Sequence, residues 1–298
     1  AGVLLALLGG GGGGAKAGRI AATVPVTSGA SSLAADRDGA VVAGPGSELT
    51  AVDNADNPEP IQVQGGLLHV AERGVAVNGD SFWLDNAEDG VVRIERRPGG
   101  AAEPVGVAPS RYHRLAATGD GILVLSPDEG TIERLDLDGA LVATGAAPRG
   151  ANHLAADANF GYALFKNRSD TTDRSIYTVD ATTLDHAEPP AKGLLGTKIK
   201  TGDENLYVQH GTGLDVVRSA PGSTTRMIDV GDGVRDFDEN EGWLWVTYAD
   251  GTLKRFELAS GSPEGDPLEL PGVGIAVDAR DDRAWVLLDT DKLIDVRP

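Results

Sequence analysis

The sequence predicts an all-β fold, namely a seven-bladed β-propeller of four-stranded antiparallel blades. Three observations lead to this prediction. Short runs rich in valine and leucine alternate with Gly- and Asp-containing turns, and no continuous helical periodicity of three turns is present. One short pattern recurs about every forty residues. The last copy of the repeat lacks a strand that an N-terminal segment can supply.

The composition fits a single globular unit. The chain has 298 residues, of which 41% are hydrophobic and 41 are glycine. That apolar content is enough for a core, and all-β barrels and propellers of this length commonly form one domain.

The recurring pattern has five residues: small or polar, aliphatic, small, apolar, then Asp, Asn or Thr. Its second positions are 37 to 44 residues apart, which is a propeller period. Clear copies occupy residues 32–36, 114–118, 153–157 and 274–278, and weaker copies occupy residues 74–78, 197–201 and 234–238.

The strands of one repeat are legible in the sixth copy, which reads WLWVTY at 243–248, a turn at 249–251, TLKRFEL at 252–258 and an outer strand near 267–270. The seventh copy continues with 284–288 and 292–296, after which no outer strand remains. Residues 19–26 (RIAATVPV) precede the first blade and can supply it, which removes the exposed sheet edges of an open ring. We therefore expect the propeller to span residues 19–298.

Residues 1–18 are expected to be a Gly-rich leader or linker. The segment 2–8 (GVLLALL) is apolar but short, and residues 9–14 are all glycine. Two interpretations stay open: the tail of a signal or membrane anchor followed by a flexible linker, or a low-complexity leader. The first interpretation predicts an extracytoplasmic protein, secreted or tethered to the membrane through its N-terminus.

The repeat resembles those of NHL, YVTN and similar seven-bladed propellers across residues 19–298. The phrases WLWVTYADGTLKRFEL and GYALFKNRSDTTDRSIYTVD are similar to the propeller region of actinobacterial surface proteins that also carry fibronectin type III or Ig-like repeats. This resemblance implies a location at the cell surface and does not imply an activity.

Charge and cysteine content exclude several classes of function. The formal net charge of −19 repels phosphate backbones, so we expect no nucleic-acid partner. The chain has no cysteine, which excludes disulfides, thiolate nucleophiles and Cys-ligated metals. We expect no cofactor.

The innermost strands predict where a ligand would bind. The third position of the pattern is mostly alanine and is expected to line the central channel, as the series Ala34, Ala76, Ala116, Ala155, Ile199, Asp236 and Ala276. The first position shares its face. A ligand-binding group is therefore predicted at one channel mouth, made of Tyr112, His113, Arg114, His153 and Asp236. Arg114 could bind an anionic group; alternatively, these side chains only solvate a wet channel.

Metal and catalytic motifs are weak. The five histidines are scattered without HxH or HExxH spacing, and no G-x-S-x-G motif occurs. Asp236, Asp238 and Asn240 have the spacing of the first ligands of a calcium loop, but Glu241 stands where that loop needs glycine. We expect a binding module for a protein, glycan or small ligand. The alternatives are a lyase or hydrolase that uses His113 or His153, and the sensor domain of a membrane receptor.

Overall fold

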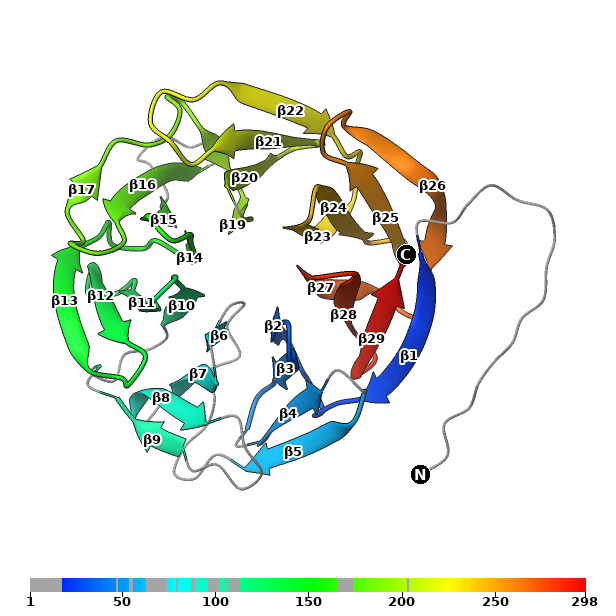
Figure 1. Cartoon of the computed structure of the whole chain (residues 1–298), viewed down its shortest axis with the longest axis horizontal. Helices are drawn as coiled ribbons and strands as arrows, with labels where there is room; N and C mark the ends of the chain where they lie inside the picture. The colour runs from blue at the N-terminus through cyan, green and yellow to red at the C-terminus, as the bar shows by residue number, and fades with distance from the viewer. Residues whose placement is uncertain are drawn as a thin grey trace.

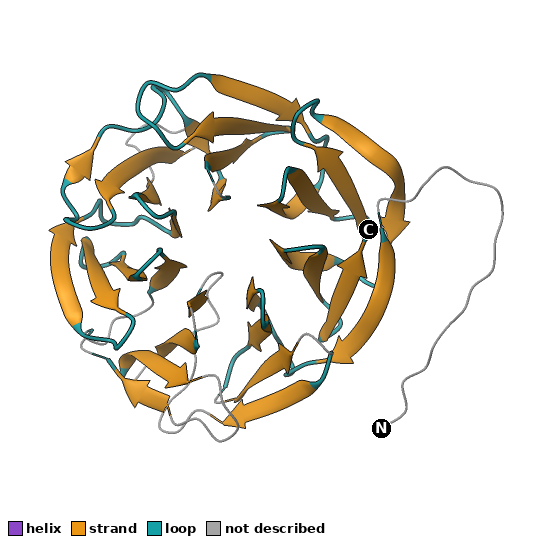
Figure 2. Ribbon diagram, viewed as in Figure 1, coloured by secondary structure: helices purple, strands orange, loops and turns teal. Residues whose placement is uncertain are grey.

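The computed structural model describes residues 18–46, 48–53, 56–62, 74–78, 80–86, 89–95, 102–105, 107, 113–165, 174–202 and 204–298. These residues form seven antiparallel sheets around a central channel (Figures 1 and 2). The predicted seven-bladed propeller is thus confirmed. The described residues contain no helix that is long and apolar enough to cross a bilayer.

The first six blades follow one another in chain order, and each runs from the channel outward. Blades 1 to 3 consist of β2 (Ser32–Asp36), β3 (Gly39–Ala43), β4 (Glu48–Asp53), β5 (Pro58–Gln62); β6 (Val75–Asn78), β7 (Ser81–Asn86), β8 (Gly90–Glu95), β9 (Ala102–Pro104); and β10 (Arg114–Ala117), β11 (Gly121–Ser126), β12 (Thr131–Asp136), β13 (Leu141–Ala146). Blades 4 to 6 consist of β14 (His153–Ala156), β15 (Phe160–Phe165), β16 (Arg174–Asp180), β17 (His186–Ala187), β18 (Leu195–Gly196); β19 (Lys198–Thr201), β20 (Asn205–His210), β21 (Gly213–Arg218), β22 (Thr225–Asp229); and β23 (Val234–Asn240), β24 (Trp243–Tyr248), β25 (Thr252–Glu257), β26 (Ser262–Glu269).

Blade 7 combines both ends of the propeller. Its order is β27 (Gly274–Arg280), β28 (Arg283–Leu288), β29 (Lys292–Arg297) and then β1 (Arg19–Pro25). In Figure 1 the blue strand β1 lies along the red strand β29. Their pairing runs from Arg19 opposite Arg297 to Pro25 opposite Lys292. The prediction that an N-terminal strand closes the ring is therefore confirmed.

The core is divided into apolar clusters between neighbouring blades. Trp83 and Trp285 on the second strands are completely buried, whereas Trp243 is only half-buried. The guanidinium of Arg255 lies 4.3 Å from the ring centre of Trp243 and 5.3 Å from that of Trp245, on the face that these two residues share. Large second-strand side chains thus fill the spaces between sheets, which leaves the innermost strands to shape the channel.

Candidate functional site: the central channel

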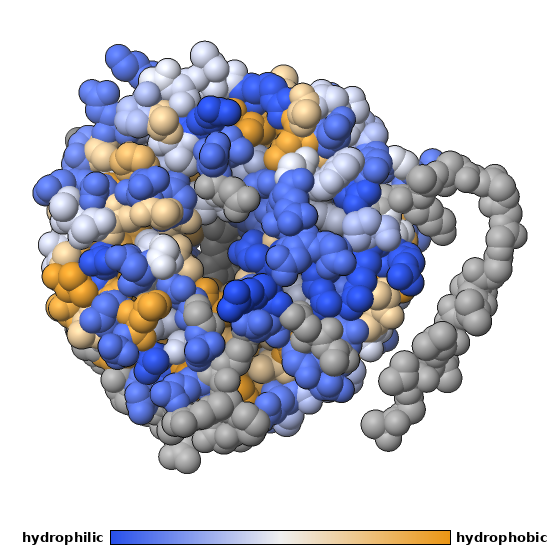
Figure 3. Space-filling model, viewed as in Figure 1, coloured by the Kyte–Doolittle hydropathy of each residue, from blue (hydrophilic) through white to orange (hydrophobic). Residues whose placement is uncertain are grey.

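The central channel holds a cavity of about 160 Å³, lined by residues from the innermost strand region of all seven blades. Figure 3 shows the hollow at the centre of one face, with hydrophilic side chains gathered over β23 and β27 on one side of it. The wall of the cavity is therefore not uniform around the ring.

The pairing of each innermost strand with its second strand identifies the equivalent residues in the seven blades. We call the residue opposite the middle of the second strand the central position. In blade order, the central positions are Ala34, Ala76, Ala116, Ala155, Lys200, Asp238 and Asp278. Blades 1 to 4 thus present alanine, and blades 5 to 7 present charge.

In blades 5 to 7 this alignment adds Lys200, Asp238 and Asp278 to the cavity wall, whereas all residues of the predicted channel column except Ile199 line the cavity as expected. There the sequence pattern selects Ile199, Asp236 and Ala276, which lie one or two residues before the central position. The register of β23 shifts between Val234 and Asp236, and that of β27 shifts between Gly274 and Ala276. This bulge accounts for one residue of the difference in β23 and β27. The other arises because Val234 and Gly274 pair with the last residue of the second strand, whereas Arg114 pairs with the last but one.

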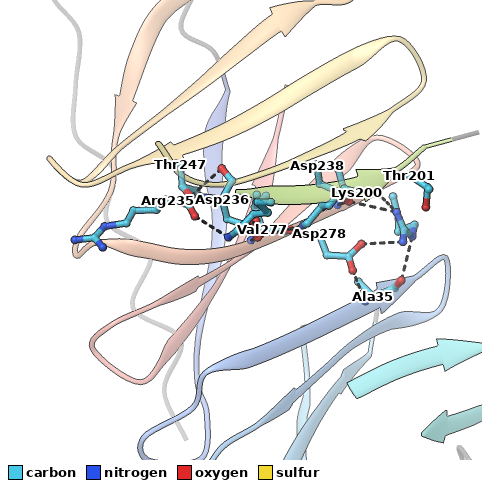
Figure 4. A network of polar contacts seen from close by, with 12 residues as sticks. Ala35, Lys200, Thr201, Arg235, Asp236, Asp238, Thr247, Val277 and Asp278 are labelled. Atoms are coloured by element: carbon cyan, nitrogen blue, oxygen red, sulfur yellow. Dashed lines mark hydrogen bonds and ion pairs between the residues drawn. The ribbon is translucent and has the colours of Figure 1, made fainter. Parts of the chain in front are cut away.

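A network of charged side chains connects blades 5, 6 and 7 (Figure 4). Lys200 Nζ lies 3.1 Å from Asp236 Oδ2 and 3.8 Å from Asp238 Oδ1, and it donates to the carbonyl of Val277 at 2.5 Å. Lys198 Nζ lies 3.1 Å from Asp236 Oδ1. Two lysines of blade 5 therefore neutralise aspartates of blade 6.

The same network closes the ring on its inner side. The carboxylate of Asp278 in blade 7 accepts the backbone N–H of Ala35 in blade 1 at 3.1 Å. Arg280 donates through Nε to the carbonyl of Ala35 at 3.0 Å, and its Nη2 lies 3.1 Å from Asp278 Oδ1. Blades 7 and 1 are thus joined at the channel by side chains, as well as at the rim by β1.

Asp278 is held in an environment that disfavours its charge. Burial raises the pKa of Asp278 to about 7; the negative charge of Asp238 also raises it, while Arg280, Lys200 and the Ala35 N–H lower it. With 15% of its side chain exposed, Asp278 faces the cavity that it lines. The network can therefore take up or release a proton near neutral pH.

The predicted site residues lie in two places, with His113, Arg114 and His153 at the neighbouring starts of β10 and β14 and Asp236 on β23. Asp236 lines the cavity, whereas His113, Arg114 and His153 do not. Arg114 Nε donates to the carbonyl of Asn152 at 2.7 Å, and His153 is 8% exposed. Tyr112 lies outside the described residues.

His113 has a different environment from the one expected at a channel mouth. Its side chain and that of Asp85 in blade 2 are both 0% exposed, with 2.6 Å between Nδ1 and Oδ1. The backbone N–H of His113 also donates to Asp85 Oδ2 at 2.7 Å. This pair connects blade 2 with the segment that enters blade 3, away from solvent.

The calcium-loop spacing does not form a calcium loop. Asp236, Asp238 and Asn240 lie on one strand, β23, and the carboxylates of the two aspartates bind lysines and backbone N–H groups of blade 7. The described residues contain no group of three His, Cys, Asp or Glu side chains placed to hold a metal ion.

Sequence reasoning missed Lys198, Lys200, Asp278 and Arg280. The available signal was the alternation of charge at i and i+2 within three consecutive repeats, namely Lys-x-Lys, Asp-x-Asp and Asp-x-Arg. Residues two apart on a strand share a face, so each pair belongs to one wall.

Comparison with known proteins supports the fold alone. Virginiamycin B lyase from Staphylococcus aureus is similar over 93% of this chain and 98% of its own, with a TM-score of 0.68 and 12% identity. BamB from Moraxella catarrhalis is similar over 90% of this chain and 85% of its own (TM-score 0.57, 13% identity). The computationally designed Ika8 protein is similar over 96% of this chain and 100% of its own (TM-score 0.63, 12% identity). No family model and no curated protein sequence matches the chain.

Proposed function

We propose that the protein is a binding module that takes a small polar ligand into its central channel. The observation that carries the proposal is the change at the central position, from alanine in four consecutive blades to charge in the next three. The alanines leave room, and the charged wall offers hydrogen-bonding and ionic groups on the opposite side. Such a combination of space and a few placed polar groups is typical of ligand sites.

Catalysis is not part of this proposal. The enzyme alternative depends on His113 or His153, and neither lines the cavity. The side chain of His113 is wholly buried against Asp85. The resemblance in fold to a lyase adds no reaction, because one fold supports many unrelated functions.

Filling the cavity should weaken binding strongly. Ala116 lies at a central position in the cavity wall, so Ala116→Leu places a larger side chain in the ligand's space. We expect compounds found by ligand-observed NMR in a library of small polar molecules to bind this variant at least about tenfold more weakly, since even 1.4 kcal/mol is a tenfold change.

Thr144→Leu is the matched control. Thr144 is exposed on the outermost strand β13, so this substitution introduces the same leucine side chain far from the channel. Compounds that bind both variants as they bind the wild-type protein would place the ligand site elsewhere and contradict the proposal.

The proposal includes an extracytoplasmic location. It is supported by the apolar segment 2–8 and the glycine run that precede the propeller. Fractionation of source cells with an antibody against the propeller tests it: recovery from the medium or the cell envelope is expected, and recovery only from the cytosol would contradict it.

A further inference from the structure

In blades 6 and 7, aspartate side chains bind backbone N–H groups on the innermost strand of the following blade. Asp238 accepts the N–H of Ala279 at 2.8 Å, and Asp278 accepts the N–H of Ala35 at 3.1 Å. In both cases the carboxylate stands at a central position, and the N–H belongs to the residue after the central position of the following blade. One geometric rule therefore relates a side-chain carboxylate to a backbone donor across two blade boundaries.

A third hydrogen bond follows the same rule two residues earlier on β23. Asp236 stands two residues before its central position and accepts, at 2.9 Å, the N–H of Val277, which stands one residue before the central position of the next blade. The offset between carboxylate and donor is the same in all three cases. It follows from the way neighbouring innermost strands lie beside each other, and so it applies around the ring.

Between blades 3 and 4 the donor is present and the carboxylate is absent. Thr118 N–H bonds to the Gly121 carbonyl and Asp157 N–H to the Phe160 carbonyl, so by antiparallel alternation Ala117 and Ala156 direct their N–H groups away from the second strands. Both residues line the cavity. The side chain placed to receive the Ala156 N–H is that of Ala116, which packs in one cluster with Ala156 and has no acceptor.

The boundary between blades 2 and 3 repeats this arrangement. Ala76 stands at the central position, packs in one cluster with Ala117, and likewise has no acceptor for the Ala117 N–H. The cavity thus has at least two neighbouring donors whose equivalents elsewhere in the ring bind a carboxylate.

We infer that the channel ligand is a small organic carboxylate, whose carboxylate group accepts the N–H of Ala117 or Ala156 in the place that an aspartate occupies at the equivalent boundaries. This inference rests on the proposed function, and it assigns the ligand class. A cavity of about 160 Å³ has the volume of about five water molecules, which suits a mono- or dicarboxylate of a few carbon atoms.

The charges of the opposite wall permit a further negative charge. Lys198, Lys200 and Arg280 face three aspartates, so the network is balanced when every carboxylate is ionised and carries one positive charge when Asp278 is protonated. An incoming carboxylate favours the protonated form, so binding takes up protons near neutral pH.

Titration of the wild-type protein tests the ligand class directly. Acetate and succinate are added, with acetamide and succinamide as neutral controls of nearly the same shape, and the backbone amides are followed by NMR. We expect saturable downfield shifts of the Ala117 or Ala156 amide proton with the acids only. Equal shifts with the amides, or no shift of either amide, would overturn the inference.

Ala116→Asp supplies the missing carboxylate from the protein itself, and Ala116→Asn is its uncharged control. We expect the Ala156 N–H to exchange its hydrogen more slowly in the Asp variant than in the Asn variant. We also expect the Asp variant to bind acetate at the Ala156 N–H at least about tenfold more weakly. An Asp variant that folds but leaves the Ala156 amide as in the Asn variant would overturn the inference. If Ala116→Asp does not fold, Ala76→Asp makes the same test at the Ala117 N–H.

The pH dependence has a definite sign. Asp278 is faced by Arg280 on its own strand, by Asp238 on β23, by Lys200 on β19 and by the Ala35 N–H on β2. Since a bound anion favours protonated Asp278, affinity for acetate should fall as the pH rises through about 7, by at most tenfold per unit. Asp278→Asn keeps an acceptor for Ala35 and should flatten this profile; an unchanged slope in that variant would contradict the coupling.

Failure of this inference is distinguishable from failure of the proposed function. If carboxylates do not bind while other library compounds bind and are lost on Ala116→Leu, the channel is the site and the ligand class is wrong. If nothing that binds responds to Ala116→Leu, the channel itself is wrong.

Discussion

Deletion of residues 1–28 is expected to destabilise the propeller by on the order of 5 kcal/mol. The deletion removes β1, which pairs with β29 from Arg19 to Pro25, and with it the buried side chain of Val24. It also removes Ser28, whose hydroxyl group donates to Oδ2 of Asp291 at 3.1 Å. Burying one valine contributes about 1.5–3 kcal/mol and each hydrogen bond about 0.5–1.5 kcal/mol, so the sum approaches the whole stability of a typical domain.

Deletion of residues 1–14 is the control, because it leaves β1 and its pairing with β29 intact. Its midpoint of thermal unfolding should stay close to that of the full chain, whereas deletion of residues 1–28 should lower it strongly and promote aggregation through the free edge of β29. Equal midpoints for the two truncations would show that β1 does not hold the ring closed.

The fold was predictable because its signals are local and repeated. Each blade is recognisable in the sequence as a short apolar run, a turn and a second apolar run. The seventh copy of the repeat has one strand too few, which implies that the first strand of the chain completes that blade. No side-chain contact has to be known for this step. What the count could not reveal is the second closure, in which Asp278 and Arg280 bind the backbone of Ala35 more than 240 residues away in sequence.

The site was less predictable because it depends on register. β23 and β27 each begin one residue earlier relative to the second strand and also contain a one-residue bulge, so the sequence pattern selects Asp236 and Ala276, two residues before the central Asp238 and Asp278. The role of a carboxylate in this channel is to bind a backbone N–H of the next blade, and a backbone donor has no sequence signature. His113 illustrates the same difficulty, because its partner Asp85 lies 28 residues earlier in a different blade.

Asp85→Ala is expected to destabilise the protein by about 2–6 kcal/mol, because it removes a wholly buried acceptor from two hydrogen-bonding groups of His113. Asp85 Oδ2 accepts the backbone N–H of His113 at 2.7 Å, and Asp85 Oδ1 lies 2.6 Å from Nδ1 of the same histidine. Neither side chain is exposed. Without the carboxylate, two donors of His113 stay buried without this acceptor, and each such group costs about 1–3 kcal/mol.

Asp215→Ala is the matched control for this substitution, because it also removes an aspartate from a histidine. Asp215 Oδ2 lies 3.2 Å from Nε2 of His210, but these side chains are 18% and 33% exposed, so water can replace the lost partner. We expect a loss of at most about 1 kcal/mol there, as for ion pairs that water can reach. Urea unfolding of both variants measures the difference: similar losses would mean that His113 finds another acceptor, whereas a several-fold larger loss for Asp85→Ala assigns the pair to holding blades 2 and 3 together rather than to the channel site.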